Sequence, residues 1–311
     1  MKILLLDKNH LLITEQLSAR GFTLVEDFTS SYEEVLAKVG DFEGIIIRSR
    51  IPIDQNFLEH AKNLKFVARV GAGMENIDVE FAKKSAIQLI SSPEGNRDAV
   101  AEHVVGMLLV LMNRLFISSL EVKNGIWKRE ENRGDELLGK TIGLIGYGNM
   151  GKAVAKRFSG FGSKVIFHDI LPDIGDEFAT QVPLDQLKKE ADILSLHLPI
   201  TKETHHLIDA KFILEMAKDF YFINTARGKN VKTKDLVEAV KSGKIKGVAL
   251  DVLEYEKASF ENLDTENDDL QFLLNSEKTI ITPHIAGWTV QSKEKLAQVI
   301  VDKIDAQFLQ T

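Results

Sequence analysis

A glycine-rich turn between an apolar run and a helical stretch restricts the fold of this chain more than any other feature of its sequence. The run TIGLI at 141–145 leads into Gly146, Gly148 and Gly151, spaced as G-x-G-x-x-G, and the residues from 149 onward read as a helix. Glycines at these positions permit a tight turn and a close approach of the backbone. The pattern therefore indicates a strand joined directly to a helix, as in parallel α/β sheets.

Apolar strands and helical stretches alternate along the whole chain, which is typical of parallel sheets covered by helices on both faces. Helical stretches at 32–39 and 54–63 separate strands of the first third. The predicted strands form two series, at 2–7, 22–27, 43–49, 65–71 and 87–92, and at 141–148, 164–170, 191–198, 219–226, 246–253 and 278–283. Because 311 residues suffice for about two domains, the sequence predicts an α/β protein with two doubly wound parallel-sheet domains.

The join between the two series is predicted to be one long helix at 99–123, capped by Asp98 and apolar on more than one face. A helix of this kind is usually buried on two sides, here between the domains and against a second subunit. The last helix, at 290–309, is expected to return to the first domain. The predicted domains are therefore 1–97 plus 286–311, and 98–285.

Composition excludes several classes of function. A net charge of −7 and a pI near 5.7 argue against nucleic acid or an anionic membrane as the main partner. The absence of cysteine excludes disulfides, thiolate catalysis and cysteine-based metal centres, and no metal site is predicted. The start of the chain does not read as a signal peptide, and the most apolar run, at 104–112, is about half the length that spans a bilayer. We expect a cytoplasmic protein with a small-molecule partner.

The glycine turn also predicts a dinucleotide. A pyrophosphate suits the free amides at the start of the helix, so the expected contacts are Gly146, Gly148, Asn149, Met150 and Gly151. The alternative is a glycine-rich strand–helix turn without a ligand.

Asp169 is expected to select the form of the dinucleotide. It lies 18 residues past Gly151, at the end of the next strand, where a carboxylate accepts from an adenosine ribose hydroxyl. The alternative role is a helix cap. Residues 170–172 include no arginine for a 2′-phosphate, which favours NAD over NADP.

Reactive and polar residues follow the strands of the second series, at the sheet edge where such folds bind ligands. They are His197, Pro199, Thr201, Arg227, Asp251, Glu256 and His284. An imidazole such as that of His284 can accept or donate the proton of an alcohol near neutral pH. The alternative is a structural histidine whose hydrogen bonds are satisfied within the core or at the surface. A carboxylate, from Glu256 or Glu254, would orient the ring and stabilise its protonated form. The guanidinium of Arg227 matches a substrate carboxylate and polarises the adjacent carbonyl.

Five segments together resemble the D-2-hydroxyacid dehydrogenases over essentially the whole chain. They are GLIGYGNMG (143–151), SLHLPITKETHHLI (195–208), INTARG (223–228), GVALDVLEYE (247–256) and TPHIAG (282–287). The resemblance implies that Arg227, Glu256 and His284 are catalytic. Glu256 is preferred to Glu254 because the family's glutamate stands five residues past the aspartate that Asp251 matches. It also implies a Rossmann cofactor domain inserted in a flavodoxin-like substrate domain, and a homodimer built on the joining helix.

Further contacts follow from the resemblance alone. It implies that NAD is also contacted by His197, Pro199, Thr204, Thr225, Ala226, Asp251, His284 and Gly287. The segment VARVGAGMENID (67–78) is similar to the family's substrate loop, in which amides near Val70 and Gly71 bind the substrate carboxylate. A tight glycine turn is the alternative for this pair, and Asn96 matches an asparagine near the hinge.

The sequence departs from the family pattern at two places. Lys257 replaces the proline that usually follows the glutamate, and Lys229, Lys232 and Lys234 replace a glycine and an acidic pair. These three lysines are interpreted as a solvated face.

Among the family, the chain looks most like the phosphoglycerate dehydrogenases of serine biosynthesis. IIIRSR (45–50) is similar to their VRS segment, and Arg69 precedes the glycine turn as theirs does. The expected reaction is oxidation of D-3-phosphoglycerate, with Arg48 and Arg69 binding the phosphate. The alternatives for these arginines are a local ion pair and support of the turn. No regulatory segment follows residue 311, so feedback by serine is not expected.

Two other functions stay open at this point. One is a glyoxylate, hydroxypyruvate or D-lactate-type reductase with the same machinery. The other is a non-enzymatic protein that senses NAD.

Overall fold

The structure is a computed structural model and describes residues 1–256 and 267–308, which leaves the predicted departure at Lys257 outside the described residues. The chain divides into two compact units, Met1–Arg97 with Trp288–Thr311 (unit 1) and Asp98–Gly287 (unit 2). The second boundary lies two residues later than the predicted one at 285/286.

Unit 1 contains a parallel sheet of five strands in the order β2-β1-β3-β4-β5. This is the flavodoxin-like order that the sequence resemblance implies, and it confirms the predicted fold. The strands are β1 (Lys2–Leu5), β2 (Thr23–Glu26), β3 (Gly44–Ile47), β4 (Phe66–Arg69) and β5 (Gln88–Ser91). The helices are α1 (Leu12–Ala19), α2 (Tyr32–Leu36), α3 (Gln55–His60), α4 (Val79–Lys84), α12 (Val290–Phe308) and the 3₁₀ turn η1 (Val39–Asp41).

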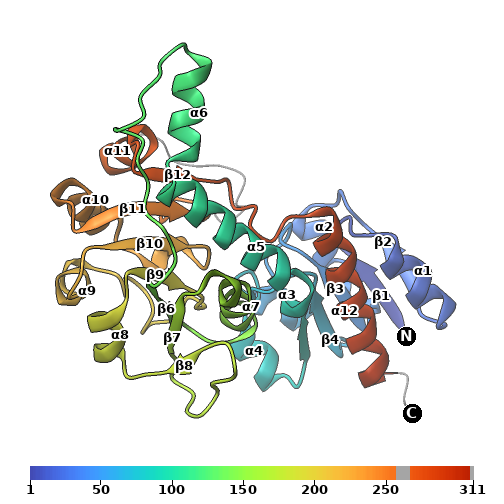
Figure 1. The fold of residues 1–311 in the computed structure, drawn as a ribbon. Coiled ribbons are helices and arrows are strands. Elements are labelled where there is room, and N and C mark those ends of the chain that lie inside the picture. Colours follow the sequence, from blue (N-terminus) through green and yellow to red (C-terminus); the bar gives the residue numbers. More distant parts are fainter. Residues whose placement is uncertain (257–266, 309–311) are drawn as a thin grey trace. The chain divides into compact units, whose positions relative to one another are not determined.

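Both ends of the chain build unit 1. Successive residues of β1 point to opposite faces of the sheet, so Ile3 and Leu5 contact one helical layer and Leu4 contacts the other. Helix α12 lies beside α1 and buries Ile300 and Val301 on the same side as Ile3 (Figure 1). The last helix is therefore an integral part of the first sheet domain.

Unit 2 contains a parallel sheet of seven strands in the order β12-β11-β10-β9-β6-β7-β8. The strands are β6 (Thr141–Ile145), β7 (Lys164–His168), β8 (Thr180–Gln181), β9 (Ile193–Leu196), β10 (Phe220–Asn224), β11 (Ile245–Leu250) and β12 (Thr279–Ile281). The other elements are α7 (Asn149–Phe158), α8 (Leu184–Glu190), α9 (Ala210–Glu215), α10 (Thr233–Ser242), α11 (Asp268–Asn275), η2 (Ser159–Phe161) and η3 (Gly228–Asn230). The order reverses between β6 and β9, as in a Rossmann fold. Strand β8 was not predicted, because two residues are too few to show a period.

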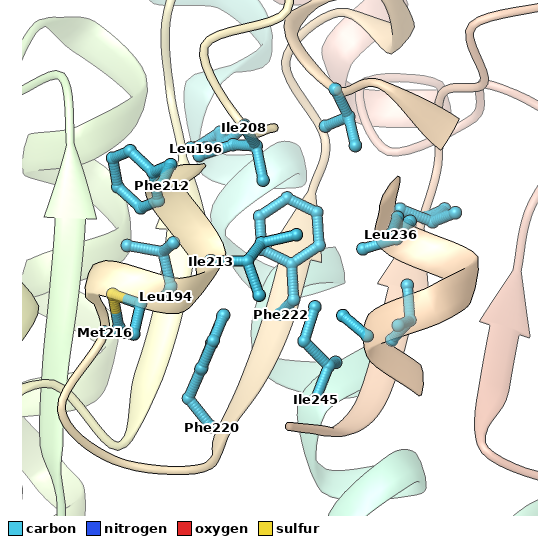
Figure 2. Packing of buried hydrophobic residues seen from close by; sticks show 14 of the residues in the cluster. Leu194, Leu196, Ile208, Phe212, Ile213, Met216, Phe220, Phe222, Leu236 and Ile245 are labelled. Atoms are coloured by element: carbon cyan, nitrogen blue, oxygen red, sulfur yellow. The ribbon is translucent and has the colours of Figure 1, made fainter. Parts of the chain in front are cut away.

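The inner strands of unit 2 are mainly apolar because helices cover both faces of the sheet. On one face, Leu194 of β9 and Phe222 of β10 pack against Phe212 and Ile213 of α9 and Leu236 of α10 (Figure 2). The opposite face packs against α5 and α7. This double burial fixes the strand ends where the predicted site residues lie.

The predicted single helix at 99–123 is wrong. Helix α5 (Pro93–Met112) begins six residues earlier, with a proline at its first position, and α6 (Leu115–Lys123) follows at an angle of 59°. Arg114 has a φ of 52°, a left-handed conformation that interrupts the helix. Asp98 lies inside α5 and forms an ion pair with Arg157 at 2.8 Å, so it is not a cap.

The two helices differ in burial. Helix α5 buries Val104, Leu108 and Leu111 in the core of unit 2, whereas α6 has no buried residue. Among the described residues, no single helix is long and apolar enough to cross a membrane, and α5 and α6 meet that test only together, as a bent pair. The burial of α5 shows that its apolar composition serves the core.

Candidate active site

The glycine turn after β6 requires glycine at two positions. A Cβ atom at Gly146, where φ is 93°, would lie 2.4 Å from the carbonyl oxygen of His197. A Cβ atom at Gly151 would lie 2.2 Å from the carbonyl oxygen of Gly146. Gly148 instead borders open space, with no atom within 4 Å of the corresponding position, and α7 begins directly after it. A phosphate group therefore has room against the amides of the first turn, which includes Asn149 and Met150.

Asp169 braces this turn. Its Oδ2 accepts from the backbone N–H of Tyr147 at 2.7 Å, and Oδ1 accepts from Leu171 N–H at 3.0 Å. The structure thus places the carboxylate beside the glycine turn and not at a helix start. Each oxygen retains a further lone pair for a ribose hydroxyl. Within the described residues, Thr225 Oγ1 is also buried without a partner, as expected for a group that hydrogen-bonds a cofactor.

His284 and Glu256 form a direct pair. The Nδ1 atom of His284 lies 2.8 Å from Oε2 of Glu256, whose Oε1 accepts from the backbone N–H of Leu253. Glu254 is engaged elsewhere: it contacts His206 Nε2 at 2.6 Å and accepts from Thr233 N–H at the start of α10. The structure therefore selects Glu256 as the partner of the histidine. Because Nδ1 faces this carboxylate, we assign proton exchange with a substrate to Nε2.

The backbone of His284 is held in an unusual conformation. Its φ is 55°, which costs a non-glycine residue of order 1–3 kcal/mol and occurs mainly where function requires it. The N–H of His284 donates to the carbonyl oxygen of Asp251 at 2.9 Å. The N–H groups of Ile285 and Ala286 donate to Oδ1 and Oδ2 of Asp251, each at 2.8 Å.

Asp251 supports the loop that carries His284. Its side chain is 2% exposed and accepts three protein hydrogen bonds, the third from the hydroxyl of Thr282. Its carboxylate therefore holds this loop, and the contact with NAD that the resemblance implies stays a prediction. Gly287, the last residue of unit 2, ends this loop.

Arg227 lies in the loop after β10, and hydrogen bonds of the Asn224 side chain hold this loop. The side chain of Asn224, which is 1% exposed, donates to the carbonyl oxygen of Arg227 at 2.9 Å and accepts from Ala226 N–H at 3.0 Å. A Cβ atom at Gly228 would lie 1.9 Å from the carbonyl oxygen of Leu253, so the arginine loop packs directly on the segment that leads to the glutamate. Asn224 and Gly228 were not predicted as site residues, although both lie in the INTARG segment.

The turn after β9 is held by its own side chains. Thr204 Oγ1 donates to the carbonyl oxygen of Pro199 at 2.7 Å, and Thr201 N–H donates to Thr204 Oγ1 at 2.7 Å. His197 Nε2 lies 3.0 Å from Ser195 Oγ. Burial lowers the pKa of His197 to about 3, so its ring is neutral at physiological pH.

We expect this histidine to make unfolding pH-dependent. The unfolded chain binds a proton at His197 below about pH 6.5, whereas the folded protein does so only near pH 3. Its contribution to stability is present at neutral pH and is lost as the pH falls between these values, by up to about 1.4 kcal/mol per pH unit. His197→Asn should flatten the dependence of the unfolding free energy between pH 4 and 6.5, measured by urea denaturation. The exposed control His60→Asn should not; equal slopes in all three proteins would contradict the assignment.

The glycine turn of unit 1 carries two of the predicted substrate residues, Val70 and Gly71. The amide of Val70 donates to the carbonyl oxygen of Ile47 at 2.8 Å, and the amide of Gly71 donates to Ser92 Oγ at 3.0 Å. These two amides are therefore engaged within the protein, and binding of a substrate carboxylate by amides near them stays a prediction. Asn96 lies in the first turns of α5, and its Oδ1 is buried without a partner among the described residues.

The two arginines of unit 1 are held differently. Arg69 Nε donates to the carbonyl oxygen of Arg48 at 3.2 Å, and its guanidinium covers Gly71, where a Cβ atom would lie 2.1 Å from Nη1. Arg69 thus supports the glycine turn. The guanidinium of Arg48 stacks on Trp288 at 4.3 Å, and the carboxylate of Asp7 accepts from the backbone N–H of Arg48 at 2.6 Å. Trp288 was not predicted, because no local pattern links it to residue 48.

Comparisons with known proteins agree with this arrangement. The model for the NAD-binding domain of D-isomer specific 2-hydroxyacid dehydrogenases matches residues 105–286. The chain is 35% identical to a hydroxypyruvate reductase of Thermotoga maritima, over 88% of this chain and 87% of that protein. It is also 35% identical to a D-3-phosphoglycerate dehydrogenase of Archaeoglobus fulgidus, over 88% of this chain but 51% of that protein.

A solved structure is similar along nearly the whole length. It is a D-lactate dehydrogenase from Aquifex aeolicus in complex with NAD and lactic acid, with a TM-score of 0.84 and 31% identity over 98% of this chain and 95% of that one. The chain therefore belongs to the D-isomer specific 2-hydroxyacid dehydrogenase family and is an NAD-dependent dehydrogenase.

Proposed function

We propose that this dehydrogenase oxidises D-3-phosphoglycerate to 3-phosphohydroxypyruvate. The observation that supports a phosphorylated substrate is the state of Arg48 in unit 1. Its guanidinium carbon lies over the ring of Trp288 at 4.3 Å, and stacking of this kind engages a face of the guanidinium and not its N–H groups. Among the described residues, no hydrogen bond or ion pair to this guanidinium is present, although the charge of Asp7 partly offsets the lowering of its pKa by burial.

The position of Arg48 in the sheet also favours a ligand. It directly follows β3, and β1 is flanked by β2 on one side and by β3 on the other. In flavodoxin-like sheets, ligands bind beyond the strand ends at this reversal of order. A phosphate is a suitable ligand because its oxygens match the paired N–H groups of a guanidinium.

The residues of unit 2 carry the reaction. Arg227 binds the substrate carboxylate and polarises the adjacent carbonyl. His284 accepts the hydroxyl proton through Nε2 during oxidation and returns it during reduction, while Glu256 holds the ring through Nδ1. NAD, when bound on the turn that includes Gly148 and beside Asp169, supplies the hydride acceptor.

Reduction of hydroxypyruvate or glyoxylate is the second candidate. The hydroxypyruvate reductase of Thermotoga maritima matches this chain over 87% of its own length, whereas the D-3-phosphoglycerate dehydrogenase of Archaeoglobus fulgidus matches over 51%. The two candidates differ in the substituent on the third carbon of the substrate and not in the proton or hydride chemistry.

A panel of acids followed by NADH absorbance distinguishes the candidates. We expect the largest kcat/KM for the pair D-3-phosphoglycerate and 3-phosphohydroxypyruvate, compared with D-glycerate, hydroxypyruvate, glyoxylate and D-lactate. A larger value for hydroxypyruvate or glyoxylate would replace the first proposal with the second. No turnover of any acid would favour a protein that only senses NAD.

Arg48→Gln should separate phosphorylated from unphosphorylated substrates. A hydrogen bond to a charged group contributes about 1.5–3 kcal/mol, so kcat/KM for D-3-phosphoglycerate should fall about ten- to 100-fold. The value for D-glycerate should change little, because that substrate lacks the phosphate. Arg129→Gln, at an exposed position, is the control for loss of one positive charge. Equal losses of kcat/KM on both substrates would show that Arg48 does not bind the phosphate.

We also propose that a second copy of the chain covers α6. This helix exposes Leu115, Phe116, Leu120 and Val122, and Trp127 beyond it is 78% exposed. Several large apolar side chains exposed on one short helix indicate an interaction site. The double substitution Phe116→Asp with Leu120→Asp should convert a dimer to a monomer in sedimentation velocity, whereas Leu214→Asp, at another exposed leucine, should not. A monomeric parent protein at micromolar concentration would contradict the proposal.

A further inference from the structure

His103 makes a contact that the predicted chemistry does not explain. It lies on α5, and its Nε2 is 3.0 Å from Thr282 Oγ1. The Thr282 hydroxyl is in turn 2.6 Å from Oδ1 of Asp251, and the imidazole Nε2 lies 3.7 Å from the same oxygen. These three side chains connect α5 to the loop that carries His284, all within unit 2.

The direction of each hydrogen bond follows from the donors available. Asp251 accepts from two backbone N–H groups, Ile285 at Oδ1 and Ala286 at Oδ2. A carboxylate only accepts, so the single hydroxyl hydrogen of Thr282 is directed to Asp251. The thioether of Met107 also lies 3.9 Å from this hydroxyl, but it is a much weaker acceptor than a carboxylate. Thr282 Oγ1 must therefore accept from His103, whose Nε2 carries the hydrogen.

We propose that His103 is a positioning residue for the catalytic histidine. Its Nε2–H orients the Thr282 hydroxyl toward Asp251, and that hydroxyl fixes the carboxylate in the rotation that binds the amides of Ile285 and Ala286. Those two amides directly follow His284 in the chain, so their hydrogen bonds help to hold its backbone at a φ of 55°. His103 acts through this network and does not itself exchange a proton with the substrate.

Two substitutions of similar size test whether the side chain at position 103 must donate the hydrogen bond to Thr282. His103→Gln retains an N–H donor, whereas His103→Glu offers only acceptors at neutral pH and competes with Asp251 for the Thr282 hydrogen. We expect His103→Glu and His103→Ala to lower kcat by about tenfold, with an unchanged Kd for NADH, and His103→Gln to stay within about threefold of the parent. The assay uses hydroxypyruvate or 3-phosphohydroxypyruvate, whichever the parent reduces faster, so it does not depend on the phosphate preference.

A double-mutant cycle tests whether the histidine acts through Thr282. If it does, His103→Ala combined with Thr282→Val should lose no more activity than Thr282→Val alone. Losses that multiply would show that His103 acts by another route, and equal activity of the Gln and Glu variants would overturn the proposal. Thermal unfolding midpoints of the variants identify any that fail to fold, in which case the Gln and Glu pair decides.

The tautomer is testable without catalysis. In ¹⁵N-edited NMR spectra of the protein, the Nε2 of His103 should show a protonated nitrogen, and this signal should change in Thr282→Val. A neutral ring protonated at Nδ1 would overturn the proposal even if the activities agreed with it.

Discussion

Replacing His284 with Ala is expected to lower kcat by about 10²–10⁴-fold, the usual contribution of a general acid or base. The imidazole is the group whose partner and position suit proton exchange: Glu256 holds Nδ1 at 2.8 Å, and the loop amides hold the backbone on Asp251. Removing the ring takes away the proton acceptor without disturbing the glycine turn. The Kd for NADH, measured by fluorescence titration, should therefore stay close to that of the parent.

The control for this substitution is His205→Ala, which removes an exposed imidazole from the same unit. The pH dependence adds a second readout, because the limb of the oxidation profile that reports the base should disappear in His284→Ala. A near-normal kcat would show that His284 is a structural histidine without a role in proton transfer. A weakened affinity for NADH with an unchanged kcat would assign it to cofactor binding alone.

Replacing Arg227 with Gln is expected to lower kcat/KM by about 10²–10⁴-fold. Two hydrogen bonds between a guanidinium and a carboxylate, at about 1.5–3 kcal/mol each, correspond to a loss of this size. Arg227→Lys keeps the charge but loses the planar fork, so its activity should lie between those of the parent and Arg227→Gln. Steady-state kinetics on the preferred acid, with NADH at saturation, measure the effect.

The fold of the loop should survive these substitutions. The hydrogen bonds between Asn224 and the loop use the backbone of Ala226 and Arg227, and Gly228 packs through its backbone on Leu253. Lys229→Gln removes an exposed charge from the same loop and should leave kcat/KM unchanged. If Arg227→Gln and Lys229→Gln had equal effects, general charge and not recognition of the carboxylate would explain the loss.

The fold class was predictable because its signals are local. The strands are short apolar runs, and their period does not depend on which strands become neighbours. The glycine turn was readable for the same reason, since close contacts at Gly146 and Gly151 arise within one strand–turn–helix unit and the strand beside it. Local signals placed the start of the joining helix wrongly. Pro93, Gly95 and Asn96 read as a loop, yet α5 begins there, and a Cβ atom at Gly95 would lie 2.6 Å from the backbone of Leu296 on α12.

Roles that depend on long-range contacts needed the structure. Glu254 and Glu256 are the same residue type two positions apart, but Glu254 contacts His206 whereas Glu256 contacts His284. Asp251 sits at a strand end, as a ligand contact would, and only its three protein donors show that it holds a loop. Trp288 reaches Arg48 across 240 positions of the chain, a contact that no motif encodes.

The sequence by itself determined the α/β class, the family and the residues able to exchange a proton, bind a carboxylate and cradle a dinucleotide, because these depend on side-chain chemistry and short-range periodicity. Tertiary structure decided which carboxylate orients His284 and where the helix after β5 begins and ends. It also decided that Asp251 hydrogen-bonds the loop that carries His284. A hydrogen bond requires two atoms within about 3 Å, and residues such as His103 and Thr282 reach that distance only when the sheet and helices have packed.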